Sequence, residues 1–158
     1  IMKNLRIFPI LFISILFIVA ACSKLSNNGD LDGRWKLQQI YSKASPEEAH
    51  YTLPLDAQAD NIYWNFQLNL LAITSTNPLN GHTGETTARF SYTPSRLSVT
   101  QTYIHYRNRD SLITDPATTS LTRLGIRGNA TDYRIERLNK TSLILCSAYD
   151  SLVFYKAH

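Results

Sequence analysis

The stretch Trp64-Asn65-Phe66-Gln67-Leu68-Asn69-Leu70 alternates strictly between apolar and polar residues. Because successive side chains of a strand point to opposite faces, this pattern is typical of a strand with one face on a core and the other in solvent. The residues expected on the buried face are Trp64, Phe66, Leu68 and Leu70. The apolar positions then shift to Leu71 and Ile73, which predicts a bulge or a tight bend between two strands.

Alternation with the same period continues in both directions from this stretch. Toward the N-terminus, residues 33–41 form a predicted strand with Trp35 and Leu37 on one face. Toward the C-terminus, apolar pairs mark two further strands, Phe90 with Tyr92 and Leu97 with Val99. The chain ends in a predicted three-strand meander at residues 132–138, 141–148 and 151–157, with turns at Asn139-Lys140 and Tyr149-Asp150.

Eight strands with few helices predict an all-β fold, a small eight-stranded antiparallel meander barrel, with a β-sandwich as the alternative. We favour the barrel because closure leaves no exposed strand edge. Two short helices are also predicted, each with an N-cap and a proline at the first helical position: Ser45-Pro46-Glu47-Glu48 and Asp115-Pro116-Ala117. Gly125 or Gly128 would end the second helix.

The N-terminal residues carry the pattern of a secretory signal. Lys3 and Arg6 form a short basic region, and residues 7–21 are apolar except for Pro9 and Ser14. This run is shorter than the roughly 20 residues that cross a bilayer as a helix. A cleaved signal peptide at residues 1–21 is therefore favoured over an uncleaved membrane anchor.

The signal ends in Val19-Ala20-Ala21-Cys22, which resembles the lipobox of bacterial lipoproteins. The resemblance implies that the Cys22 thiol accepts a diacylglycerol group and that acyl chains such as palmitate anchor the mature chain in a membrane. Ser23 is not the aspartate that retains many lipoproteins in the inner membrane, so outer-membrane attachment is expected. Residues 23–26 are not acidic, which favours the periplasmic face over the cell surface.

The mature chain divides into a predicted flexible tether at residues 22–30 and a barrel domain at residues 31–158. The predicted signal holds two of the 16 basic residues, which leaves 14 against 12 acidic residues. This balance excludes the strong basic patch that nucleic-acid binding requires. If Cys22 is acylated, Cys146 has no disulfide partner, and its apolar neighbours Leu143-Ile144-Leu145 predict a buried, inert thiol.

No arrangement of residues in the sequence indicates catalysis. There is no zinc-protease, phosphate-loop, nucleophile-elbow or paired-cysteine motif. The four histidines, at positions 50, 82, 105 and 158, lack the spacing of metal ligands. We therefore expect no enzymatic activity, no metal and no cofactor.

One segment indicates a ligand site. If Leu97 and Val99 face the interior, strict alternation also turns four later residues inward: Gln101, Tyr103, His105 and Arg107. Aromatic and polar groups that converge on an apolar wall are typical of small-molecule sites. The alternative is a bulge after Val99, which would turn Ile104 and Tyr106 inward and leave His105 and Arg107 in solvent.

Basic residues are also concentrated in one part of the chain, because nine of them accompany four acidic residues between Thr86 and Lys140. The excess either favours an anionic ligand, a lipid headgroup or an acidic partner, or simply keeps strand surfaces soluble. Asp110-Ser111-Leu112 and Asp150-Ser151-Leu152 each resemble the acceptor of Bacteroides O-glycosylation. A plain hairpin turn explains the second equally well.

The two ends of the predicted barrel domain carry a family resemblance. Leu31-Asp32-Gly33-Arg34-Trp35-Lys36-Leu37 has a Gly-x-Trp at the start of the first strand, and the chain ends in residues 138–145 and Leu152-Val153-Phe154-Tyr155-Lys156. Together these resemble the lipocalin-like lipoproteins of Bacteroidetes, which largely lack an assigned function. The resemblance covers most of residues 31–157. It implies structural roles for Gly33 and Trp35, with Lys156 lying across the indole in a cation–π contact.

Two functions remain open for this sequence. The first is a lipid-anchored envelope lipoprotein whose barrel binds a small apolar or amphipathic ligand. The second is a non-enzymatic structural or interaction module, in which a filled barrel docks onto envelope partners. The interior discriminates between them, because a roomy cavity that reaches Tyr103 and His105 favours a carrier and a solidly packed core favours a scaffold.

Overall fold

The computed structural model describes residues 27–76 and 85–158, so Cys22 and the predicted signal peptide lie outside the described residues. The strands are β1 (Gly33–Ser42), β2 (Leu55–Asp56), β3 (Tyr63–Gln67), β4 (Leu70–Thr74), β5 (Glu85–Thr93), β6 (Arg96–His105), β7 (Asp110–Leu112), β8 (Ala130–Leu138), β9 (Ser142–Cys146) and β10 (Asp150–Lys156). Three single-turn 3-10 helices accompany them: η1 (Gly29–Leu31), η2 (Gln58–Asp60) and η3 (Thr122–Leu124).

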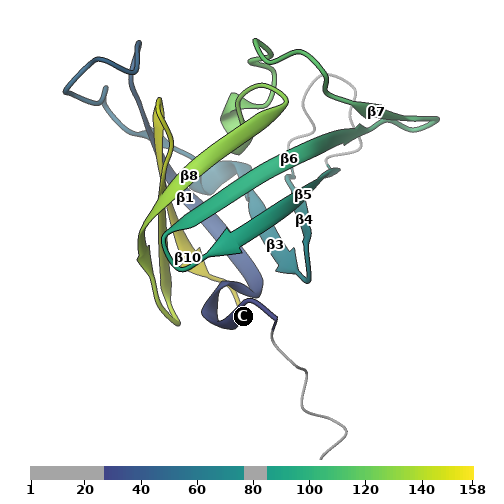
Figure 1. The fold of residues 1–158 in the computed structure, drawn as a ribbon, viewed down its shortest axis with the longest axis horizontal. Helices are drawn as coiled ribbons and strands as arrows, with labels where there is room; N and C mark the ends of the chain where they lie inside the picture. The colour runs from purple at the N-terminus through teal and green to yellow at the C-terminus, as the bar shows by residue number, and fades with distance from the viewer. Residues whose placement is uncertain (1–26, 77–84) are drawn as a thin grey trace, which may run out of the picture.

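Eight of these strands form a closed antiparallel barrel (Figure 1). Hydrogen-bonded neighbours follow the order β1, β3, β4, β5, β6, β8, β9 and β10, and β10 returns to pair with β1. β2 adds two residues beside β1, and β7 extends the sheet beside β6. The predicted eight-stranded meander barrel is confirmed, including its C-terminal hairpins β8–β9 and β9–β10.

The barrel has two different ends (Figure 1). One end, which we call the closed end, carries η1, the C-terminus, the turn between β3 and β4 and the turn between β8 and β9. The opposite end, which we call the open end, carries residues 43–54, residues 113–129 and the turn between β9 and β10. The last residues of the predicted tether lie against the closed end, since the Asn28 side chain donates hydrogen bonds to Asp32 and to the Leu68 carbonyl.

Alternate side chains of each wall strand point into the barrel and form its core. Trp35 and Leu37 on β1 are fully buried, as are Leu97 and Val99 on β6, which confirms the predicted inward faces. The largest fully buried side chains are Trp35, Trp64, Phe66, Tyr133 and Phe154. Aromatic residues bury large apolar areas, so these five contribute heavily to the hydrophobic stabilisation of the barrel.

The stretch from Trp64 to Leu70 is not one strand. Trp64 and Phe66 on β3 are buried, as predicted, but Leu68 and Leu70 are exposed, so the prediction that they are buried is wrong. The reason is a two-residue turn at Leu68 and Asn69, with Gln67 opposite Leu70. A bend was predicted after Leu70, where the apolar positions shift to Leu71 and Ile73. The turn is present, but it begins two residues earlier, at Leu68.

Neither predicted helix forms where its N-cap predicts it. At Ser45 the chain makes a single turn, in which the Glu48 N–H donates to the Ser45 carbonyl. Asp115 accepts a hydrogen bond from the Ala117 N–H at 2.8 Å and so closes a short turn with its own side chain. The helical residues of that segment come later, in the single turn of η3, and Gly125 ends it with φ = 90°. Cap residues without an apolar stripe behind them do not propagate a helix.

Candidate functional site at the open end of the barrel

The closed end carries the contact that the family resemblance implies. The Lys156 ammonium lies 4.2 Å from the Trp35 ring centre and donates hydrogen bonds to the Asp30 and Asp32 carbonyls. Gly33 has φ = 110°, and a Cβ there would lie 3.3 Å from the Lys156 side chain. Burial lowers the pKa of Lys156, while the charges of Asp30 and Asp32 act against this shift. These residues close the barrel base and therefore have a structural role.

Above this base, aromatic side chains of several wall strands contact one another inside the barrel. The Trp64 ring lies 5.9 Å from Tyr133 of β8 and 5.2 Å from Phe154 of β10, measured between ring centres. Phe66 packs edge-on against Phe90 of β5 at 5.2 Å. Rings from four strands therefore pack together in the barrel core.

The open end is covered by the segment between β7 and β8, residues 113–129, which we call the plug. Its apolar side chains join the barrel core, namely Ile113, Leu121, Leu124 and Ile126. Two aromatic side chains of the barrel bind its backbone: Trp64 Nε1 donates to the Leu124 carbonyl at 2.9 Å, and Tyr133 Oη donates to the Gly125 carbonyl at 2.5 Å. Buried indole and phenol groups need such partners, so the plug completes the interior.

An ion pair fastens the end of the plug to the barrel rim. Asp150 is only 2% exposed, and its carboxylate accepts two hydrogen bonds from Arg127, at 2.5 and 2.9 Å. The Ser42 hydroxyl donates to the same carboxylate at 2.6 Å. The hydrogen bond to Asp150 raises the pKa of Arg127 above its usual value. A buried, bidentate pair of this kind fixes the orientation of both side chains.

Beside this ion pair lies a surface pocket of about 240 Å³. Its walls are Pro116, Arg127, Ala130, Thr131, Asp132, Ser147, Ala148 and Tyr149. The Arg127 guanidinium, which forms one wall, lies 4.9 Å from the centre of the Tyr149 ring. The pocket therefore combines an aromatic face, a cation and small side chains on the outer rim of the barrel.

The predicted ligand site on β6 does not line the interior. Gln101 has φ = 49° and forms a bulge, since two residues of β6 oppose Ala88 of β5. After the bulge, Thr102 and Ile104 are buried while Gln101 and Tyr103 are exposed. Arg107 is also exposed, and His105 is half-buried on the outer face. The predicted inward orientation of Gln101, Tyr103, His105 and Arg107 is therefore wrong, and the alternative bulge after Val99 is present.

The outward His105 belongs to a chain of hydrogen bonds. Its Nε2 lies 2.8 Å from the Thr87 hydroxyl, and its Nδ1 lies 2.7 Å from the Asp110 carboxylate. A hydroxyl, an imidazole and a carboxylate in this order also occur in hydrolases, where N–H donors that face the substrate and a site that excludes water contribute much of the catalysis. In this protein, by contrast, the Asp110 side chain is 60% exposed to solvent. The chain of bonds fastens β7 to β6 and β5.

Two other predictions change with the structure. Cys146 is half-buried on the outer face of β9, where its thiol lies 3.4 Å from the Ser151 hydroxyl, so its predicted burial is wrong. Four of the nine basic residues between Thr86 and Lys140 form ion pairs with acidic side chains: Arg96, Arg123, Arg127 and Arg134. Much of the local positive charge is therefore neutralised within the protein.

Among the described residues, one buried side-chain polar atom has no hydrogen-bond partner. It is the hydroxyl of Thr102, which is fully buried. The next buried side chain on the same strand is Ile104, toward the open end. Within residues 27–76 and 85–158, no cluster of three or more metal-ligating side chains is present.

A closed eight-stranded meander barrel with a buried Gly-x-Trp at its base defines a lipocalin-like protein. The lipocalin-like domain family matches residues 16–157, and the chain belongs to this family. No curated protein matches the chain.

Two solved structures from Bacteroides share the fold. A lipocalin-like protein from Bacteroides uniformis ATCC 8492 aligns with a TM-score of 0.52 and 19% identity, covering 82% of this chain and 100% of the other. An uncharacterized protein from Bacteroides eggerthii DSM 20697 aligns with a TM-score of 0.50 and 15% identity, covering 80% of this chain and 98% of the other. At these identities the likeness establishes the fold alone.

Gly125→Ala should detach the plug. A Cβ at Gly125 would lie 2.7 Å from Leu152 Cδ1, and φ = 90° is strained for alanine. We expect a loss of about 2–4 kcal/mol in the free energy of unfolding, measured by urea titration. Gly29→Ala is the control, because φ there is 59° but no atom lies within 4 Å of the added Cβ. Equal losses in both variants would contradict a role for plug packing.

Tyr133 should make the protein sensitive to alkaline pH. Burial raises the pKa of its phenol well above the usual value near 10, so the unfolded chain loses this proton first. The contribution of this group to the free energy of unfolding is fully present below pH 10 and decreases as the pH rises above 10. In Tyr133→Phe the alkaline fall should be shallower by up to about 1.4 kcal/mol per pH unit.

The measurement is the free energy of urea unfolding between pH 8 and 11. At neutral pH, Tyr133→Phe should cost about 1 kcal/mol, because the bond to the Gly125 carbonyl is lost. Tyr155→Phe is the control, since that ring is exposed. An alkaline slope that is identical in wild type and Tyr133→Phe would rule out the coupling.

Proposed function

We propose that this chain is a lipid-anchored lipoprotein of the cell envelope whose lipocalin-like barrel is a packed, non-enzymatic scaffold for interactions at its open end. One observation carries the proposal. Trp64 contacts Tyr133 on the opposite wall of the barrel and Phe154 two strands away, and it also binds the backbone of the plug. A barrel filled in this way has the packing of a protein core, whereas carriers of the same architecture keep a cavity.

The proposed attachment through Cys22 fits this arrangement. Asn28 is hydrogen-bonded at the closed end, and six residues of extended chain reach at most about 21 Å. A lipid on Cys22 would therefore hold the closed end near the membrane and direct the open-end loops away from it. Ser23 and the non-acidic residues after it favour the periplasmic face of the outer membrane. No helix in the described part of the chain is long and apolar enough to cross a membrane.

The open end also offers a surface to a partner. Residues 43–54 project from the rim (Figure 1), and Leu53 in this loop is 92% exposed. Tyr51 and Leu55 beside it are partly exposed, and Lys43 lies 4.9 Å from the Tyr51 ring centre. Apolar and aromatic side chains at the tip of a loop, with a cation beside them, suit a protein partner better than bulk water.

A second function has one observation in its favour. The unpaired Thr102 hydroxyl is a buried donor and acceptor that a small amphipathic ligand could satisfy. Such a ligand would have to lie beside Ile104 in the upper part of the barrel and displace side chains of the plug. The carrier function that the lipocalin-like fold suggests would then be confined to this upper region.

Native mass spectrometry of the protein extracted from its own membrane separates these functions. We expect a mass that includes acyl chains on Cys22 and no retained small molecule, because the core is already filled. The Cys22→Ser variant should lack the mass of the acyl chains and should no longer be found in the membrane fraction. A stoichiometric ligand that is lost in Thr102→Val would replace the scaffold by the carrier, and membrane retention of Cys22→Ser would contradict the lipid anchor.

A further inference from the structure

The closed end exposes two leucines at the turn between β3 and β4. Leu68 is 59% exposed and Leu70 is 42% exposed, whereas Trp64 and Phe66, which precede them on β3, are buried. The turn is fixed in place, because the Leu68 carbonyl accepts a hydrogen bond from the Asn28 side chain at 2.8 Å. Two apolar side chains are therefore held on a rigid tip rather than on a loose loop.

Leucine is unfavourable at position 68 for two reasons. The φ of Leu68 is 57°, a left-handed conformation that hairpin turns usually place at glycine, asparagine or aspartate. Its side chain also gains little from burial within the folded chain, because most of it remains in solvent. Asparagine would relieve both costs, so the leucine points to a contact outside the protein.

The path of the chain indicates what that contact is. Asn28, which binds the tip, is six residues from Cys22, and an extended chain of that length spans at most about 21 Å. With acyl chains on Cys22, Asn28 lies within this distance of the lipidated residue, and its side chain is hydrogen-bonded to Leu68. Leu53, the most exposed large apolar side chain described, lies at the opposite end and has no such tether.

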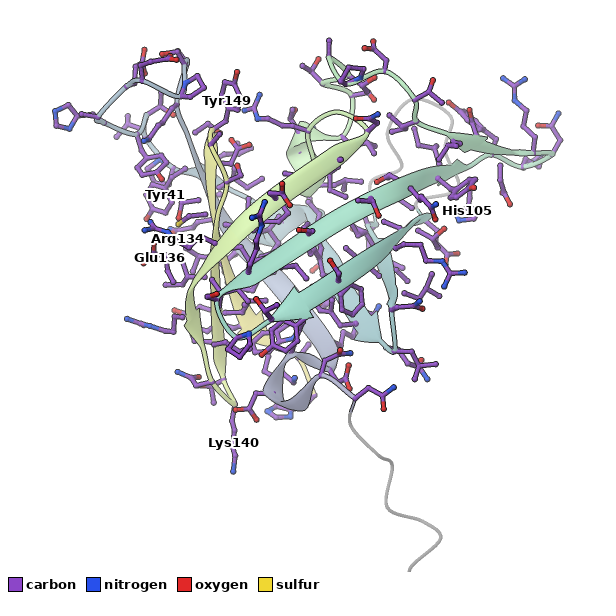
Figure 2. The ribbon with its side chains drawn as sticks, viewed as in Figure 1. Tyr41, His105, Arg134, Glu136, Lys140 and Tyr149 are labelled. Atoms are coloured by element: carbon purple, nitrogen blue, oxygen red, sulfur yellow. The ribbon has the colours of Figure 1, made fainter. Side chains whose placement is uncertain are left out.

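Positive charge accompanies the leucines. Arg89 lies opposite Leu70 on β5, and its guanidinium donates a hydrogen bond to the Asn69 side chain at 2.8 Å. Lys140 projects from the β8–β9 turn at the same end of the barrel (Figure 2). Asp30 and Asp32 also lie at this end, and the Lys156 ammonium interacts with the charges of both. Lys156, Arg89 and Lys140 together outnumber these two carboxylates, which leaves a net positive charge to attract anionic headgroups.

We propose that the closed end rests on the phospholipid surface, with Leu68 and Leu70 among the headgroups and Arg89 and Lys140 beside lipid phosphates. This inference rests on the proposed lipid anchor at Cys22 and extends it. The anchor alone leaves the barrel free to rotate on its tether, whereas contact through the tip gives the barrel one orientation. Side chains that combine apolar area and basic charge are typical of surfaces that bind membrane interfaces.

The test uses the acylated protein in vesicles of phosphatidylethanolamine and phosphatidylglycerol, with hydrogen–deuterium exchange as the readout. Relative to the unacylated Cys22→Ser chain in buffer, amides 67–71 should exchange at least about fivefold more slowly in vesicles. Amides of the open-end loop at residues 43–54 should not change. Vesicles of the zwitterionic lipid alone should reduce the protection, because Arg89 and Lys140 then meet no net negative charge.

The decisive variant is Leu68→Asn with Leu70→Thr. Asparagine suits the left-handed turn and threonine suits a strand, so the fold should be retained or become more stable. Flotation with vesicles should persist, because the acyl chains remain, while the protection of amides 67–71 is lost. Leu53→Asn is the matched control and should leave this protection intact.

The outcomes separate this inference from the proposed function. A protein that lacks acyl chains and does not float with vesicles contradicts the anchor. A protein that floats but shows no protection at residues 67–71, or shows it at residues 43–54, overturns the orientation. Protection that appears in native membrane fragments but not in lipid vesicles identifies a protein at the closed end and overturns the lipid contact.

Discussion

The pairing of the first barrel strand with the last is the constraint on which the rest of the molecule depends. At one end of this seam Trp35 lies opposite Lys156, and at the other Ser42 lies opposite Asp150. The pairing shifts by one residue between Leu37 and Gln39, and with this shift it positions the ammonium over the indole at the base and the buried carboxylate at the rim. A slip of one residue would turn every side chain of the strand to the other face and would break both ends together.

The plug follows from the chemistry of the interior rather than from the loop sequence alone. Trp64 and Tyr133 fill the centre with apolar rings, but each ring also brings one polar group into a dry environment. The wall strands use their carbonyls in the barrel ladder, so both polar groups take acceptors from the plug, at Leu124 and Gly125. The aromatic core and the plug therefore depend on each other, because the plug supplies the acceptors that the core rings need.

Alternation predicted the strands because a barrel wall has one dry face and one wet face along its whole length. It could not locate Gln101 or Leu68, since each holds a left-handed backbone without the glycine or asparagine that usually marks one. The turn at Leu68 exposes Leu68 and Leu70, and the bulge at Gln101 turns the residues of the predicted ligand site to the outside. The Arg127–Asp150 pair joins residues 23 positions apart, and nothing in either local sequence indicates that they meet.

Sequence patterns did not identify the buried residues of the plug. Apolar residues at 121, 124 and 126 lie in the segment that the sequence predicted as a short helix, and no pattern there showed that their side chains join the barrel core. The cover over the open end is therefore formed by the connection between β7 and β8, and not by the wall strands. Thr102 on β6 is the one buried side-chain polar atom without a partner among the described residues, and a strand pattern gives no sign of it, because threonine is an ordinary strand residue.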